Sequence, residues 1–128
     1  MLLEIKGLNF NYPDKEIFQS FDLKAPPGKI LHLNGPSGAG KTTLLHLIAG
    51  IQSPQSGAIT LGEEVFYDNK QKLLIEERRV GLVFQDYALF PHLNVLKNIS
   101  FGNKSITEEK INKALHQLDI SELKNKYP

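Results

Sequence analysis

Hydrophobic and polar residues alternate along much of the first part of the chain. Residues 3–6, 8–11 and, less regularly, 17–23 carry apolar side chains at every second position, which is the period of a half-buried β-strand. Between the second and third of these segments, the sequence Tyr12-Pro13-Asp14-Lys15 is typical of a turn. The pattern therefore predicts an antiparallel β unit.

Two further short strands are predicted at residues 58–61 and 65–67, on either side of Gly62. We expect them to extend the antiparallel sheet. Residues 30–33 and 80–84 are apolar without alternation, which is typical of buried strands. For residues 80–84 the pattern favours a parallel strand that is covered on both faces.

A helix is predicted over residues 41–49, because Leu44, Leu45 and Ile48 recur at helical spacing and Gly50 follows as a stop signal. The charge-rich stretch that comes before the second apolar run, residues 70–79, is typical of a solvated connector.

The character of the sequence changes after residue 85. An apolar loop at residues 87–92 precedes a short predicted helix around residues 95–99, which Gly102 ends. Residues 105–108, Ser-Ile-Thr-Glu, match a capping box for a longer helix. The apolar face expected for that helix consists of Ile111, Ala114, Leu115 and Leu118. Ser121 is a candidate cap for another helix, so this part of the chain is predicted to be a small helical subdomain.

The segment before residues 41–49 carries a motif with a definite chemistry. The pattern Gly-x-x-x-x-Gly-Lys-[Ser/Thr] is matched at every fixed position by Gly35, Pro36, Ser37, Gly38, Ala39, Gly40, Lys41 and Thr42. A loop of small residues between a strand and a helix turns backbone N–H groups inward and adds the positive end of the helix dipole. We predict that it binds nucleotide phosphates, with Lys41 at the β- and γ-phosphates and the Thr42 hydroxyl on Mg²⁺. The alternative is a glycine-rich turn that matches by chance, about once in a few hundred chains of this length.

Several single residues have two interpretations. Tyr12 is either an ordinary aromatic at a strand end or a platform that stacks on a purine base. Gln85 is either a capping residue or a polar group that meets the phosphates and metal beyond a strand end. The exposed segment Leu89-Phe90-Pro91 is either core packing or a docking surface. The four histidines, His32, His46, His92 and His116, fall on different predicted elements and are interpreted as structural.

Composition narrows the function classes. The net charge is +1 with basic and acidic residues interspersed, which gives no electrostatic case for a nucleic-acid partner. Cysteine is absent, which excludes disulfides and thiolate metal sites. The start of the chain is charged, and no apolar stretch approaches the length of a membrane span. We expect a soluble, cytoplasmic chain that is shorter than a typical α/β nucleotide-binding domain.

Taken together and in order, these motifs resemble the ATPase subunits of the ATP-binding cassette (ABC) transporter family. The resemblance covers essentially the whole chain: the phosphate loop with Thr43-Leu44-Leu45, then Ser56-Gly57, Val83-Phe84-Gln85, Leu89-Phe90-Pro91-His92-Leu93 and Asn98-Ile99-Ser100-Phe101-Gly102. It implies an α/β fold with a P-loop NTPase (RecA-like) core, an N-terminal antiparallel β subdomain and an incomplete helical subdomain. Residues 1–128 would then be a partial nucleotide-binding domain, divided into residues 1–84 and 85–128.

The resemblance also implies roles for individual residues. Tyr12 resembles the aromatic residue that stacks on adenine, and residues 37–43, which include Thr43, resemble the phosphate cradle (Walker A). Gln85 resembles the glutamine that contacts Mg²⁺ and the attacking water, so Lys41 and Gln85 are the catalytic candidates. The segment that begins at Asp86 and ends at Leu93 resembles the surface that docks on the membrane subunits. A second ATPase subunit would complete the dimer, at the cytoplasmic inner face of the membrane.

The chain also departs from the family pattern. The Leu-Ser-Gly-Gly-Gln signature, the strand that ends in a Mg²⁺-binding Asp (Walker B), the catalytic Glu and the switch His have no counterpart in the sequence. We therefore expect a truncated chain that binds MgATP and hydrolyses it poorly alone, because positioning and charge neutralisation dominate phosphoryl transfer.

Within the family, the form of the Leu-Phe-Pro-His-Leu segment favours bacterial importers. The flanks at residues 65–68 and 78–81 lean towards importers of oxyanions such as molybdate. Two alternatives remain open: a P-loop nucleotide kinase similar to guanylate kinases, and a non-catalytic nucleotide-binding remnant.

Overall fold

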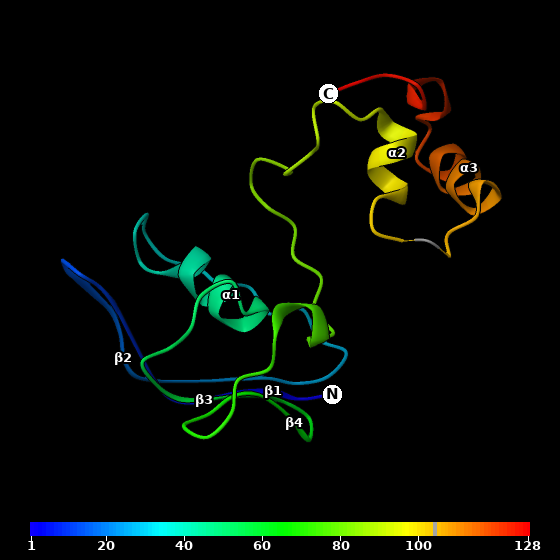
Figure 1. Ribbon diagram of the computed structural model, residues 1–128. Helices are drawn as coiled ribbons and strands as arrows, with labels where there is room; N and C mark the ends of the chain where they lie inside the picture. The colour runs from blue at the N-terminus through cyan, green and yellow to red at the C-terminus, as the bar shows by residue number, and fades with distance from the viewer. Residues whose placement is uncertain (104) are drawn as a thin grey trace. The chain divides into compact units, whose positions relative to one another are not determined.

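Four antiparallel strands form the sheet of the first part of the molecule. The computed structural model describes residues 1–103 and 105–128 and divides them into two units, residues 1–82 and 83–128. The strands of the first unit are β1 (Leu3–Tyr12), β2 (Lys15–Ala25), β3 (Ser56–Leu61) and β4 (Glu64–Tyr67). Their order in the sheet is β2-β1-β3-β4 (Figure 1). This confirms the antiparallel β unit and its extension by two short strands.

The β1–β2 hairpin is closed by a two-residue turn, Pro13-Asp14, so that Tyr12 and Lys15 face each other across it. Along β1 the alternation of side chains is interrupted at Gly7, whose φ of 55° accompanies a shift of register against both neighbouring strands. Such a bulge bends the strand and increases its twist. The break in the alternation between residues 3–6 and 8–11 therefore corresponds to an irregularity in the sheet.

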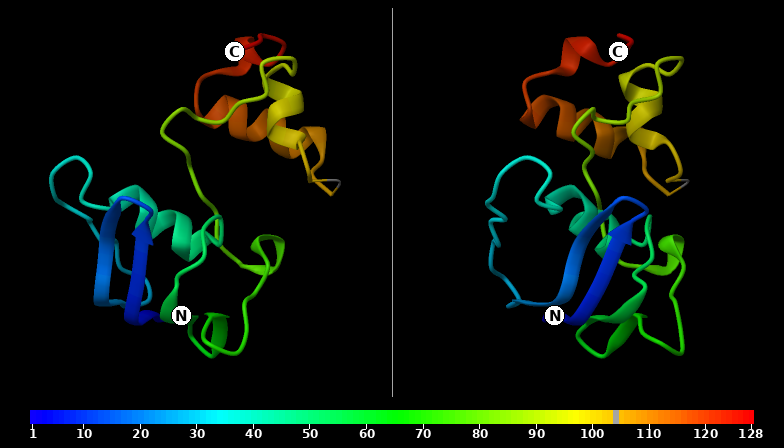
Figure 2. Two further views of the ribbon diagram at one scale, coloured as in Figure 1. Left: turned by 60° about the vertical axis from the view of Figure 1, so that its left-hand side comes forward. Right: turned by 90° about the vertical axis from the view of Figure 1, so that its left-hand side faces the viewer.

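One helix, α1 (Lys41–Ala49), covers one face of this sheet (Figure 2). Its buried leucines, Leu44 and Leu47, join a cluster of apolar side chains from the strands. The strand members of that cluster are Ile5, Leu8, Phe10, Phe18, Ile59 and Phe66. The helix has the bounds predicted from the sequence, because the loop glycines before it and Gly50 after it are strong local signals. Gly50 has a φ of 89°, and its N–H bonds to the carbonyls of His46 and Leu47.

The C-terminal end of α1 is bound by a buried guanidinium. Arg78 is 5% exposed, and its side chain donates to the carbonyls of Leu47 and Ile48 in α1, at 2.9 and 2.8 Å. It also donates to the carbonyls of Phe66 and Leu73, at 3.0 and 3.2 Å. Residues 70–79, predicted to be a solvated connector, therefore include a residue that binds the helix, the sheet and the loop together.

The buried strand predicted at residues 30–33 and the parallel strand predicted at residues 80–84 are not formed, and that part of the prediction is wrong. Residues 30–33 and 80–84 have no regular secondary structure, and Ile30 and Val83 are 100% and 86% exposed. A parallel strand depends on a neighbouring strand for its hydrogen bonds, and in the described chain neither segment joins a ladder. The described residues therefore form an α/β structure with an antiparallel sheet, and the full RecA-like core is not confirmed in them.

The second unit is helical. It contains α2 (Val95–Ser100), α3 (Glu108–Gln117) and a 3₁₀ turn, η2 (Ser121–Leu123); a further 3₁₀ turn, η1 (Ile75–Glu77), belongs to the first unit. The N-cap of α2 is Asn94, whose side chain accepts a hydrogen bond from the N–H of Lys97 at 2.9 Å. The residues after η2 fold back on α2, because the N–H groups of Val95 and Leu96 bond to the carbonyls of Lys126 and Lys124.

The start of α3 differs from the predicted capping box. Its cap is Thr107, whose hydroxyl accepts from the N–H of Lys110, whereas the Ser105 hydroxyl bonds to Asn103. Ser105 and Thr107 are two residues apart, and both residue types are favoured as N-caps. The sequence therefore left the start of α3 ambiguous by two residues. Of the predicted apolar face, Ile111 and Leu115 are buried, whereas Leu118 is 68% exposed.

Candidate functional site

The phosphate loop joins α1 through Gly40, and only glycine fits at this position. Gly40 has a φ of 89°. A Cβ atom placed on it would lie 2.5 Å from Cγ2 of Ile17 and 3.0 Å from Cζ of Phe18, both on β2. The Gly40 carbonyl accepts the first bond of the helix, from the N–H of Leu44 at 2.8 Å. Strand β2 therefore packs directly against the junction between loop and helix, and it fixes where α1 begins.

The loop itself offers hydrogen-bond donors. Ala39 donates its N–H to the carbonyl of Pro36 at 3.3 Å, which closes a turn. Across the described residues, the N–H groups of Gly38, Gly40, Lys41 and Thr42 have no acceptor in the protein, and no side chain caps the helix. Backbone donors at the positive end of a helix form a favourable environment for an anion.

Lys41 adds a full positive charge to the same loop. Its ammonium donates to the carbonyls of Gly35 and Pro36, at 2.8 and 2.7 Å. No carboxylate of the described residues lies within ion-pair distance of it. The ammonium therefore bonds to neutral carbonyl oxygens of the loop. An anionic oxygen would be a stronger acceptor, because hydrogen bonds with an ionised partner are about twice as strong as neutral ones.

The two threonines after Lys41 point to different surroundings. Thr42 is exposed at the start of α1, so its hydroxyl is accessible from solvent. Thr43 is 8% exposed, and its Oγ1 lies 3.3 Å from the hydroxyl oxygen of Tyr12. The donor groups of the loop together with the exposed Thr42 hydroxyl fit a phosphate–Mg²⁺ pair, since Mg²⁺ is usually bound by few side chains plus substrate phosphates.

Tyr12 lies beside the first turn of α1. Its hydroxyl accepts from Nε2 of Gln52 at 2.9 Å in addition to its contact with Thr43, and these bonds to Thr43 and Gln52 lower the pKa of the Tyr12 hydroxyl. Its ring meets the ring of Phe10 edge to face, with 5.1 Å between the centroids, and the residue is 38% exposed. The aromatic residue is therefore held next to the phosphate loop with part of its surface open.

A second lysine reaches the loop from the hairpin. Lys15, the cross-strand partner of Tyr12, donates from its ammonium to the carbonyl of Gly38 at 2.9 Å. This contact was not predicted from the sequence, because a lysine beside a turn is ordinary and its bond to Gly38 depends on how the hairpin packs against the loop.

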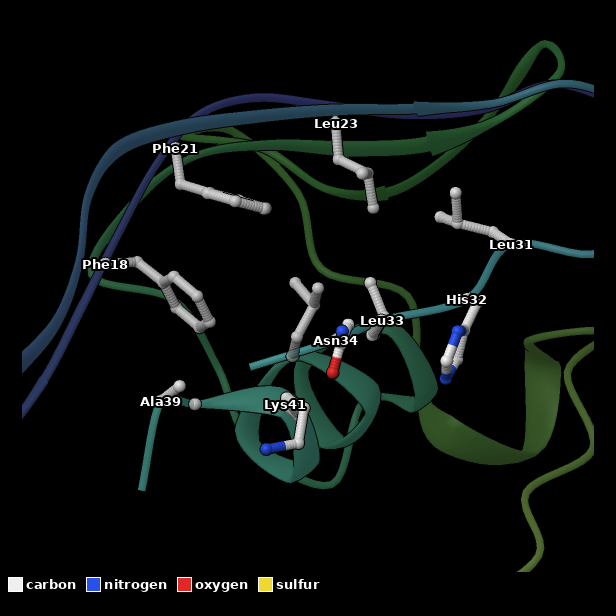
Figure 3. Close-up of a pocket in the computed structure, with 11 residues that line it drawn as sticks. Phe18, Phe21, Leu23, Leu31, His32, Leu33, Asn34, Ala39 and Lys41 are labelled. Carbon is white, nitrogen blue, oxygen red and sulfur yellow. The ribbon is translucent and has the colours of Figure 1, made fainter. Parts of the chain in front are cut away.

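An apolar cavity of about 350 Å³ lies beneath the loop (Figure 3). Phe21 and Leu23 of β2 lie on one side of it, and Ala39 and Lys41 lie on the other. Leu31 and Leu33, from the segment that was predicted to be a strand, also line it. Most of its lining is apolar, which suits packing rather than phosphate binding. We interpret it as a gap in the core between β2, residues 31–34 and the start of α1.

Gln85 and the predicted docking segment belong to the second unit. Gln85 is exposed at the start of a turn over residues 85–88. In the docking segment, Phe90 packs against Phe101 with 4.2 Å between ring centroids, and its N–H and carbonyl both bond to the side chain of Asn98. Leu89 is 53% exposed. Phe90 thus makes the contacts that the packing interpretation expects, and docking through this segment stays a prediction.

The structure therefore brings the loop, Tyr12 and Lys41 together in the first unit, and it places Gln85 in the second. Among the described residues, no three histidine or carboxylate side chains gather as a metal site. None of the helices in the described ranges has the length and apolar character to span a bilayer.

Comparison with known proteins gives two matches. The sequence profile of the ABC transporter family matches residues 18–128. The spermidine/putrescine import ATP-binding protein PotA of Aliivibrio fischeri is 34% identical over 133 aligned positions, which cover 99% of this chain and 35% of that protein. The chain thus spans about a third of the length of the curated relative that it matches.

Proposed function

This chain belongs to the ABC transporter family, and we propose that it supplies the MgATP-binding loop of an ATPase that powers solute import. The observation that carries the proposal is the loop before α1. Its free backbone donors and the ammonium of Lys41 converge beside Tyr12, with no carboxylate in ion-pair contact among the described residues. An anion with an aromatic base attached is the ligand that satisfies both features.

In this proposal each residue of the loop has a role. The N–H groups of residues 37–43, from Ser37 to Thr43, bind phosphate oxygens, and Lys41 exchanges its loop carbonyls for the β- and γ-phosphates. Tyr12 stacks on the adenine ring. Thr42 and Gln85 would ligate Mg²⁺, which neutralises charge on the phosphates during transfer. Gln85 would also orient the attacking water.

Hydrolysis is assigned to the whole protein rather than to these residues alone. The sequence contains no Ser-Gly-Gly and no apolar run followed by Asp-Glu, so the parts that would position water and complete the metal site are not among its residues. We expect MgATP binding with little turnover from this chain by itself.

Two solute classes are candidates for the transporter. The flanks around β4 favour an oxyanion such as molybdate, whereas the similar protein from Aliivibrio fischeri is named for spermidine and putrescine. The contacts of Arg78, one of those flanking residues, are with backbone carbonyls inside the fold. Its presence is therefore explained by structure and carries no weight in choosing the solute.

The partners follow from the same proposal. The segment that begins at Asp86 and ends at Leu93 would dock on membrane subunits, with Leu89 as an exposed apolar contact. A second ATPase subunit would pair with this one at the cytoplasmic face of the membrane. The kinase alternative is not favoured, because the family match covers residues 18–128.

Thermal unfolding with and without MgATP tests the proposal. A ligand at 100 times its Kd stabilises the folded state by about 2.7 kcal/mol, so we expect a rise of several degrees in Tm for the wild-type chain and none for Lys41→Ala. Lys24→Ala, an exposed lysine of β2 that is paired with Glu4, is the control and should keep the rise. An equal rise in Lys41→Ala, or none in the wild type, contradicts the proposal.

A further inference from the structure

Two cations of the first unit bind the phosphate loop in the same way. Lys41 donates to the carbonyls of Gly35 and Pro36, and Lys15 donates to the carbonyl of Gly38. A Cβ placed on Gly38 would lie 3.3 Å from the Lys15 nitrogen, so this ammonium lies directly against the loop. The carbonyls of one short loop therefore hold two positive charges, one from α1 and one from β2.

Among the described residues, neither cation forms an ion pair with a carboxylate. The ion pairs of the described residues join Lys6 and Lys24 to Glu4, and Lys124 to Glu108. Lys15 and Lys41 form none, although Lys15 lies between Asp14 and Glu16 in the sequence. An anionic oxygen is a stronger acceptor for an ammonium than a neutral carbonyl is. A bound anion would therefore form stronger hydrogen bonds with both lysines than the loop carbonyls do.

The hairpin fixes where the Lys15 ammonium lies. Lys15 is the register partner of Tyr12 across the two-residue turn. Tyr12 is anchored by its hydroxyl to Thr43 and Gln52. Lys15 therefore extends from the strand end that carries the base platform to the loop that carries the phosphate donors.

We propose that Lys15 is a second cationic binding residue for the nucleotide, which transfers its ammonium from the Gly38 carbonyl to a phosphate oxygen when the nucleotide binds. This inference rests on the proposed function, because it adds a contact to the same phosphate site. It assigns to the hairpin turn a part in phosphate recognition in addition to its part in stacking.

Titration calorimetry on the whole chain tests the proposal with two probes, MgATP and magnesium tripolyphosphate, which has the phosphates without the base. We expect Lys15→Met to weaken the binding of both probes by about 10-fold, at the low end of the effect of a hydrogen bond to a charged group because the contact is exposed. Lys15→Arg should keep most of the affinity. The loss should shrink as KCl is raised from 50 to 300 mM, because the contact is exposed and screened by salt.

Lys24→Met is the matched control, since Lys24 is an exposed lysine of the same strand that has a carboxylate partner. It should bind both probes as the wild type does. The proposal is overturned if Lys15→Met binds both probes normally, or loses MgATP but not tripolyphosphate. It is also overturned if Lys15→Met lowers the Tm of the ligand-free chain and Lys15→Arg fails to restore binding. If the wild type binds neither probe, the proposed function itself fails; if only Lys41→Ala loses binding, that function stands and the role of Lys15 does not.

Discussion

Arg78 places a guanidinium inside the first unit without a carboxylate beside it. Its hydrogen-bond acceptors are four backbone carbonyls, and the ring of Phe66 lies 5.2 Å from its central carbon. Two of those carbonyls are at the C-terminal end of α1, where the helix dipole favours a cation. Burial lowers the pKa of the Arg78 guanidinium, but the carbonyls and the dipole favour its charged form.

We predict that Arg78→Met lowers the free energy of unfolding by about 3–5 kcal/mol, because several buried carbonyls would lose their donor at once. Arg78→Lys should lose about half as much, since an ammonium cannot span the same fork of acceptors. Urea unfolding measures both. Arg79→Met, at the exposed neighbouring position, should stay within about 0.5 kcal/mol of the wild type; equal losses at the two positions would contradict this role for Arg78.

The residues of the site could be predicted from the sequence only where a motif specifies them by type and spacing. The spacing of Gly35, Gly40, Lys41 and Thr42 is a local pattern, and the loop lies before a helix as that pattern requires. Tyr12 was left with two interpretations, because its distance from Thr43 depends on how the hairpin packs on α1. The contacts of Lys15 and Arg78 depend on the same packing, and nothing in their sequence surroundings sets them apart from solvated lysines and arginines.

At the scale of elements, local signals predicted the hairpin strands and the helices. They failed for the strands predicted at residues 30–33 and 80–84. Antiparallel neighbours close in sequence find each other through a short turn, as β1 and β2 do across Pro13-Asp14. The apolar run at residues 30–33 specifies burial but not a partner, and in the described structure it lines a cavity instead of joining a sheet. An apolar pattern alone therefore overestimates the sheet.

The β1–β2 pair also gives a pH prediction. Glu4 lies opposite Lys24 in the register and forms ion pairs of 2.8 Å with Lys24 and Lys6. Hydrogen bonds from Lys24 and Lys6 lower the pKa of the Glu4 carboxyl. A lowered carboxyl pKa contributes stability above the unfolded-state pKa of about 4.3, and this stability is lost as the pH falls through the folded-state pKa.

Glu4→Gln should therefore be slightly less stable than the wild type at pH 7, and the difference should close as the pH falls below the unfolded-state pKa of about 4.3 and through the lowered folded-state pKa. Urea midpoints measured across that range test it. Glu63→Gln, in the exposed turn between β3 and β4, is the control for removing a carboxylate without an ion pair. A gap between Glu4→Gln and wild type that is the same at pH 3 as at pH 7 would rule out this account.

At the scale of the whole molecule, the chain forms two units with separate packing. The first unit has its core between α1 and the sheet, and the second is built around Ile111 and Leu115 of α3. Residues 80–84 run between them without regular structure. Backbone groups that belong to no helix or β-ladder open at little cost.

Hydrogen exchange should divide the molecule accordingly. We expect the amides of residues 31–33 and 81–83 to exchange at nearly the rate of an unstructured peptide, and those of Ile5 and Leu8 in the central strand β1 to exchange far more slowly. Mass spectrometry of peptides after timed exchange measures this, with the β1 peptide as the internal reference. Protection of residues 31–33 equal to that of β1 would mean that this segment is paired in solution.

The two-residue turn at Pro13-Asp14 sets the register in which Tyr12 pairs with Lys15. It is exposed and polar, and it joins two strands at the molecular surface, which are the usual reasons for choosing a place to insert a tag or to open new chain ends. Here one added residue would shift the pairing of Tyr12 with Lys15 and turn one of the two away from the loop. An engineer who needs an insertion point should therefore leave this hairpin at its present length.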